Sequence, residues 1–122
     1  RMGLILITHD LGVVADVADD ITVMYAGRAV EQAGVLETFA SPAHPYTKAL
    51  LRSIPRLDVK GQRLEVIAGL PPVLTRIPPG CPFAPRCQYA QDICTRQRPE
   101  LLTVTPGRAS ACHFAKEVMN DV

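Results

Sequence analysis

Four cysteines are the residues whose type and spacing best suit a chemical site in this sequence. Cys81, Cys87 and Cys94 fall within fourteen residues of a stretch rich in proline and arginine, and Cys112 follows after seventeen more. Four thiols grouped in this way can form two disulfides, bind one structural zinc ion or hold a 4Fe-4S cluster. A purely structural explanation is weak, because a proline-rich loop offers little core for small apolar side chains to join.

The spacing of the cysteines bears differently on the two metal hypotheses. Structural zinc sites usually present thiolates in pairs about two to four residues apart, and no such pair occurs here. A 4Fe-4S cluster accepts wider spacing, because each of its four thiolates binds a different iron. Such a cluster carries net negative charge, which Arg86, Arg96 and Arg98 would offset as neighbours in the sequence. Zinc, cluster and disulfides all stay open at this level.

His9 is a second candidate for chemistry. It follows the apolar run "GLILIT" and precedes a predicted helix that Asp10 can cap. In α/β proteins, ligands bind where strands end, and a neutral histidine there can donate to a phosphate oxygen or orient a water molecule. The alternative is a histidine whose hydrogen bonds are satisfied by contacts within its own turn.

The elements expected around His9 follow from the apolar periodicity of the first half. Residues 3–8 form a continuous apolar run, typical of a strand buried on both faces of a parallel α/β sheet. A helix is expected after Asp10, and then two strands joined at Ala26 and Gly27, where glycine suits a hairpin turn. A short helix over 35–40 follows.

Proline punctuates the second half of the chain. Pro45 suits the first turn of a helix, and Pro55 should end that helix. From about residue 56 the periodicity weakens and proline becomes frequent, so we expect a loop-rich segment with short strands over 64–68 and 101–105.

Length and charge narrow the class of protein. The 122 residues suffice for one compact domain, and the formal net charge of +1 gives no reason to expect a nucleic acid as partner. No apolar run reaches the length needed to cross a bilayer, and no leader pattern precedes the first strand, so we expect a soluble chain.

Three successive stretches carry a family resemblance. "LILITHDLGVVADVADDITVMYAGRAVEQ" resembles the switch-histidine region of ABC-transporter ATPase domains. "ASPAHPYTKALLRSIP" is similar to the segment that marks the oligopeptide and dipeptide importer branch, with His44, Pro45 and Tyr46 as its signature. "GLPPVLTRIPPGCPFAPRCQYAQDIC", followed by "ACHF", resembles the C-terminal extension of that branch. Together the three cover the chain from Gly3 to Phe114.

The resemblance implies a fold and a division of the chain. It implies an α/β fragment, the C-terminal piece of an ABC ATPase (P-loop NTPase) domain, followed by a small loop-rich, cysteine-containing subdomain. Residues 1–40 would be the end of the ATPase core, 41–55 a linking helix unit, and 56–122 the extension. In the intact subunit His9 would contact the γ-phosphate of ATP and help to hold the attacking water.

The resemblance also implies partners and parts that these residues lack. The phosphate-binding loop, the signature loop and the catalytic glutamate of the family are absent from the 122 residues, so this chain alone should not hydrolyse ATP. The sequence looks truncated at its N-terminus, and an isolated piece is expected to self-associate. The intact subunit would bind ATP and Mg²⁺, pair with a second ATP-binding subunit, and contact permease subunits at the cytoplasmic face of the cell membrane.

For the four cysteines, the resemblance favours a 4Fe-4S cluster, with zinc as the alternative, on Cys81, Cys87, Cys94 and Cys112. Native disulfides rank last because cytosolic thiols are kept reduced, although air can empty or oxidise the site of an isolated piece. The rival hypothesis is a self-contained metal- or cluster-binding module in sensing or electron transfer. His44 is predicted to cap a helix rather than to contact the transport machinery.

Overall fold

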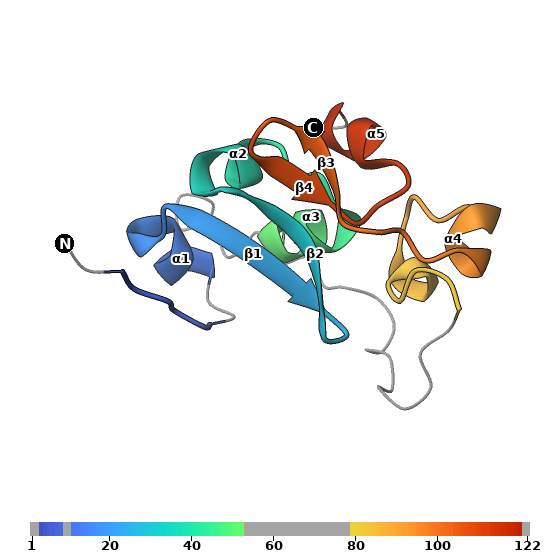
Figure 1. Ribbon diagram of the computed structural model, residues 1–122, viewed down its shortest axis with the longest axis horizontal. Helices are drawn as coiled ribbons and strands as arrows, with labels where there is room; N and C mark the ends of the chain where they lie inside the picture. Colours follow the sequence, from blue (N-terminus) through green and yellow to red (C-terminus); the bar gives the residue numbers. More distant parts are fainter. Residues whose placement is uncertain (1–2, 9–10, 53–78, 121–122) are drawn as a thin grey trace, which may run out of the picture.

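A four-stranded antiparallel sheet forms the centre of this small α/β chain (Figure 1). The computed structural model describes residues 3–8, 11–52 and 79–120. The strands, in sheet order, are β1 (Asp20–Tyr25), β2 (Arg28–Gly34), β4 (Arg108–Ser110) and β3 (Leu102–Thr105). Because β2 pairs with β4, one sheet joins two hairpins that lie far apart in the sequence.

The first hairpin confirms the sequence prediction. Ala26 and Gly27 both have positive φ, at 53° and 79°, which is the requirement of the tight turn whose twist matches that of its strands. The pairing runs from Tyr25 opposite Arg28 to Asp20 opposite Gly34, with an irregularity between Val23 and Met24.

Short helices surround the sheet. They are α1 (Leu11–Val17), α2 (Val35–Ala40), α3 (Pro45–Arg52), the 3₁₀ helix η2 (Ala84–Arg86), α4 (Asp92–Arg96) and α5 (Ala115–Asn120). The helices α1, α2 and α3 lie where the sequence predicts them, and β3 matches the strand expected over 101–105. The sequence did not predict α4, α5 or β4, and Pro55 and residues 64–68 lie outside the described residues.

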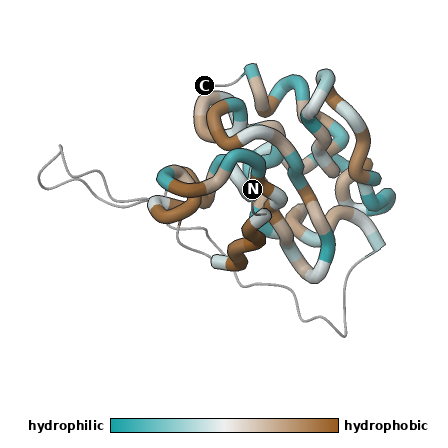
Figure 2. The backbone as a smooth tube through the Cα atoms, turned by 60° about the vertical axis from the view of Figure 1, so that its left-hand side comes forward, coloured by the Kyte–Doolittle hydropathy of each residue, from teal (hydrophilic) through white to brown (hydrophobic). Residues whose placement is uncertain are grey.

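The prediction of a buried strand over residues 3–8 is wrong for the part of the chain that the structure describes. These residues form no strand, and the side chains of Leu4, Ile5 and Ile7 are 80%, 90% and 93% exposed. Figure 2 shows this segment as a strongly hydrophobic tube near the N-terminus. A parallel strand is stable only between hydrogen-bonded neighbours, and the four paired strands described here include none for it.

The apolar core attaches the cysteine-rich segment to the sheet. Phe83 is 2% exposed and lies 5.3 Å, centroid to centroid, from the Tyr25 ring of β1. Tyr46 of α3 completes the group, at 4.6 Å from Tyr25 and 5.4 Å from Phe83. Edge and tilted ring contacts at these distances stabilise a core beyond the area that they bury. A separate cysteine-containing subdomain is therefore not confirmed, since this segment packs on the first hairpin.

Candidate functional site

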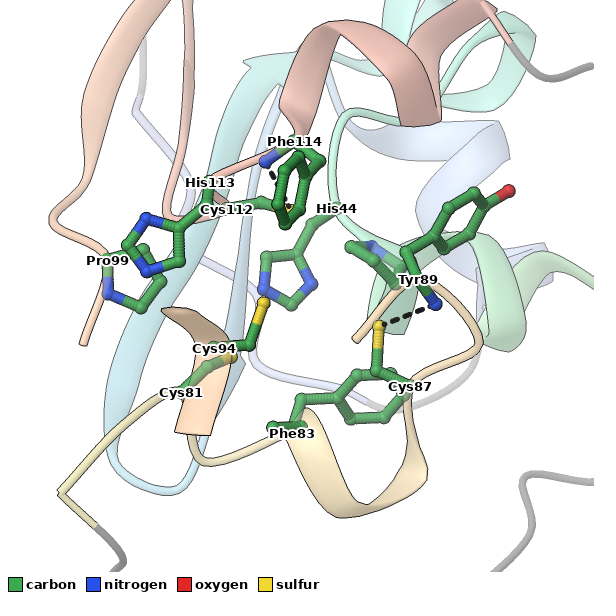
Figure 3. A pocket seen from close by; sticks show the side chains of 12 residues that line it. His44, Cys81, Phe83, Cys87, Tyr89, Cys94, Pro99, Cys112, His113 and Phe114 are labelled. Carbon is green, nitrogen blue, oxygen red and sulfur yellow. Dashed lines mark hydrogen bonds between the residues drawn. The ribbon is translucent and has the colours of Figure 1, made fainter. Parts of the chain in front are cut away.

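All four cysteines line one small cavity (Figure 3). Cys81 comes from the turn before η2, Cys87 from the end of η2, Cys94 from α4, and Cys112 from the segment that follows β4. The cavity has a volume of about 10 Å³, which is close to the space that one water molecule needs. Three separate segments thus bring together the residues that the sequence singled out.

Backbone contacts bring the first three cysteines together. The Cys81 N–H donates to the Cys94 carbonyl over 2.7 Å, and the Cys87 N–H donates to Ala84 over 3.2 Å in the turn of η2. Gly80 is buried directly against the carbonyl oxygen of Cys94, where a Cβ atom would clash with the backbone. Only glycine allows the two segments to approach this closely.

Two of the sulfur atoms accept backbone hydrogen bonds. The Tyr89 N–H donates to Cys87 Sγ over 3.3 Å, and the Phe114 N–H donates to Cys112 Sγ over 3.4 Å (Figure 3). Donors of this kind favour the thiolate form and hold a sulfur in one orientation. Hydrogen bonds to sulfur are also a means by which proteins tune thiolate-bound metal centres.

Burial disfavours the thiolate form of three of the cysteines. It raises the pKa of Cys87 to about 11 and that of Cys112 to about 12, and it also raises the pKa of Cys81. The neighbouring cysteines add to each shift, because several thiolates cannot share one apolar cavity without a cation. Metal binding would reverse this balance and release protons, since thiolates are the ligands.

The donor set fits a thiolate-bound group, but its arrangement is not that of a ligand shell. Among the described residues, no group of three or more His, Cys, Asp or Glu side chains is arranged to hold a metal ion. The cavity is also far smaller than a cluster of four irons and four sulfides. The cysteine side chains must therefore turn or move apart before such a group enters.

His44 lies among the cysteines, a position that the sequence did not predict (Figure 3). It is 1% exposed, and its Nδ1 atom accepts a hydrogen bond from the Tyr46 N–H over 3.0 Å. Its carbonyl accepts from the Lys48 N–H over 3.1 Å, so His44 is the N-cap of α3, as predicted. The backbone of Ala111 also interacts with this side chain. Burial lowers the pKa of His44 to about 4, so it is a neutral, structural neighbour of the thiols.

Sequence reasoning missed a buried ion pair beside this cap. Glu31 is 0% exposed, and its Oε2 atom accepts from the Ala43 N–H over 2.9 Å and lies 3.5 Å from Arg108 Nη2. The same Arg108 atom donates to the Ser41 carbonyl. Burial raises the pKa of Glu31. The Glu31–Arg108 pair joins β2 and β4 to the segment before α3. In the sequence, the only sign of this ion pair is an acidic residue inside a predicted strand.

Two of the arginines predicted as counter-charges, Arg86 and Arg96, make hydrogen bonds away from the sulfur atoms. His9 lies outside the described residues. Arg86 donates to the Tyr25 hydroxyl over 3.1 Å and lies 6.0 Å from the Phe83 ring, and Arg96 Nε donates to the Asp92 carbonyl over 3.5 Å.

The part of the chain described here contains no helix long and apolar enough to span a membrane.

Comparison with known proteins defines the class. Residues 30–94, more than half of the chain, match the family described as "Oligopeptide/dipeptide transporter, C-terminal region". The chain belongs to this family. The matched range holds the first three cysteines, the histidine cap and the buried glutamate.

Individual relatives agree with this assignment. The chain is 50% identical over 110 residues to the oligopeptide transport ATP-binding protein OppD of Escherichia coli, covering 90% of this chain and 32% of the relative. It is 53% identical over 111 residues to OppD of Mycobacterium tuberculosis, with 90% and 18% covered, and 48% identical over 115 residues to AppD of Bacillus subtilis, with 94% and 35% covered. The chain thus spans about a third or less of these relatives. Its resemblance to the C-terminal part of importer ATP-binding subunits is confirmed.

Proposed function

We propose that this chain is the C-terminal region of the ATP-hydrolysing subunit of a peptide importer. Support comes from the family match and from relatives that are named oligopeptide transport ATP-binding proteins. In the intact subunit, ATP and Mg²⁺ bind at a paired interface with a second ATP-binding subunit, and hydrolysis drives permease subunits from the cytoplasmic face of the membrane. His9 contributes the contact to the γ-phosphate and helps to hold the attacking water.

The four cysteines have a separate role in this proposal: they hold a 4Fe-4S cluster, with zinc as the alternative. The observation that carries it is the convergence of Cys81, Cys87, Cys94 and Cys112 on one cavity from three segments. Ligation at four dispersed positions would tie the loop around η2, the helix α4 and the end of β4 into one unit. The role is structural or regulatory, because ligation would cross-link short segments that Phe83 already anchors on the first hairpin.

Purification of the chain without oxygen tests the cluster. We expect visible absorption from iron–sulfide bonds and about four iron atoms per chain. Cys87→Ser and Cys112→Ser should lose most of that iron, because each removes one ligand, whereas Thr103→Ser, at an exposed position of β3, should keep it. About one zinc per chain without visible absorption would support the alternative. Iron and zinc contents that are both negligible would contradict the metal site.

We also propose that the isolated chain self-associates through residues 3–8. Leu4, Ile5 and Ile7 expose large apolar side chains next to one another, and burying that surface against a second copy would remove it from water. Sedimentation velocity should show species larger than a monomer, and the double change Ile5→Lys with Ile7→Lys should shift the chain toward monomer. Leu36→Lys is the matched control, since Leu36 is 80% exposed on α2 and lies outside residues 3–8. A monomer at every concentration would overturn this proposal.

A further inference from the structure

A second, larger cavity adjoins the four-cysteine cavity and has a different character. Its volume is about 350 Å³, within the range of small-molecule sites. His44, Cys81 and Phe83 line both cavities, so the two share a wall. The larger cavity lies on the side of the β1–β2 turn and of the segment that precedes β3.

Charged residues of both signs line this larger cavity. They are Arg28 on β2, and Arg98 and Glu100 in the segment before β3. The Nε atom of Arg98 is fully buried, and it has no hydrogen-bond partner among the described residues. A buried cationic donor without an acceptor costs free energy, so this position favours a ligand that brings one. An anionic oxygen would satisfy Arg98 best, because the hydrogen bond is then charge-assisted.

The remaining wall is apolar. It is formed by four residues of the buried core cluster: Tyr25, Val30, Phe83 and Ala111. A core wall is rigid, so the cavity presents a preformed surface to an apolar side chain. The three features of the cavity are the buried Arg98 Nε, the acid Glu100 and the apolar wall. A ligand with one carboxylate, one ammonium group and an apolar body matches all of them.

Other ligand classes match less well. Two arginines in the wall repel a metal cation, and the single Glu100 leaves a cation without a second carboxylate ligand. A polyphosphate needs a cradle of backbone N–H groups and several cations, whereas Glu100 would repel it here. A simple fatty acid would leave Glu100 unused.

We propose that this cavity binds a small zwitterion with an apolar side chain, of the class of dipeptides. The ligand carboxylate pairs with Arg98, the ammonium group with Glu100, and the side chain packs on Phe83 and Val30. Arg28, at the exposed rim, adds a second cation for the carboxylate. This inference rests on the lining of the cavity and does not require ATP hydrolysis.

Calorimetric titration of the 122-residue chain with L-alanyl-L-phenylalanine tests the proposal. We expect saturable binding at one site. The C-terminal amide of the dipeptide lacks the carboxylate, and its N-acetyl form lacks the ammonium group, so each should bind about tenfold more weakly or worse. The same loss is expected for the unmodified dipeptide with the Arg98→Gln variant.

Arg96→Gln is the matched control, because Arg96 lies two residues away on α4 and does not line the cavity. It should bind the dipeptide as the parent chain does. Within the described ranges Arg98 makes no hydrogen bond through Nε that its replacement would remove, and circular dichroism of both variants verifies the fold. Absence of binding to the parent chain, or equal binding by Arg98→Gln, overturns the site. Undiminished binding of the N-acetyl form overturns the assignment of Glu100 and with it the zwitterion.

Discussion

Replacing Glu31 by alanine is expected to lower the free energy of unfolding by about 3 to 5 kcal/mol. The carboxylate is fully buried and accepts from the Ala43 N–H, and its loss leaves that donor without its acceptor. It also leaves the buried charge of Arg108, whose side chain is only 10% exposed, without a counter-ion. Removing one partner of a buried pair costs more than the pair contributes, because the remaining charge keeps its desolvation penalty. Urea unfolding at neutral pH measures the effect.

Two further variants separate the charge of Glu31 from its hydrogen bond. Glu31→Gln keeps an oxygen that can accept from Ala43 but loses the attraction to Arg108, so its cost should be smaller than that of Glu31→Ala. Glu37→Ala, at an exposed position of α2, should change the free energy of unfolding by no more than about 0.5 kcal/mol. A loss below about 1 kcal/mol for Glu31→Ala would show that the ion pair does not hold β2 and β4 to the segment before α3.

Acidification is expected to destabilise the chain through His44. Its pKa falls from 6.5 in the unfolded chain to about 4 in the folded one, so between these values the unfolded state binds more protons. The free energy of unfolding should therefore drop as the pH falls through this window. By pH 4 the free energy of unfolding should have dropped by about 3 kcal/mol through this one histidine, because one unit of pKa shift corresponds to about 1.36 kcal/mol. Protonation also removes the Nδ1 acceptor that caps α3 at the Tyr46 N–H.

Two substitutions isolate this effect from the titration of carboxylates. His44→Asn keeps a neutral N-cap acceptor but underfills a buried position, so this variant should be less stable than the parent chain at pH 7. Because asparagine does not titrate, the variant should lose less stability than the parent chain between pH 7 and pH 4. His113→Asn should keep the parental dependence, because His113 is only half-buried and its Nε2 atom, 2.7 Å from the Gln97 carbonyl, lies in a solvent-exposed contact. Equal pH dependence in the parent chain and in His44→Asn would exclude His44 as the source.

The elements that the sequence predicted correctly are those determined by neighbours in the chain. The first hairpin follows from a turn in which Ala26 and Gly27 both take positive φ. The start of α3 follows from Pro45 at its first position and from His44 as its cap. Both depend on interactions within a few residues, and propensity and spacing report such interactions directly.

The errors concern interactions between distant segments. The run over residues 3–8 has the composition of a buried strand, but composition does not supply the neighbouring strands that burial requires. β4 was missed because its three residues have no clear pattern of their own, and it forms by pairing with β2. Arg98, which the sequence predicted as a counter-charge for the cysteines, lines the adjacent cavity, a position that residue spacing does not indicate.

The sequence by itself determined the family, the local turns and helix starts, and the four cysteines as the candidate site, because residue types and spacings carry that information. Only the tertiary structure decided that the cysteines converge on one cavity and that His44 lies between them. It also decided that a second cavity shares their wall and holds the buried Arg98 Nε, which has no hydrogen-bond partner in the part of the chain that the structure describes. The physical reason is burial. Desolvation and hydrogen-bond satisfaction depend on atoms contributed by segments far apart in the chain, and those atoms meet only when β2 pairs with β4 and Phe83 packs on the first hairpin.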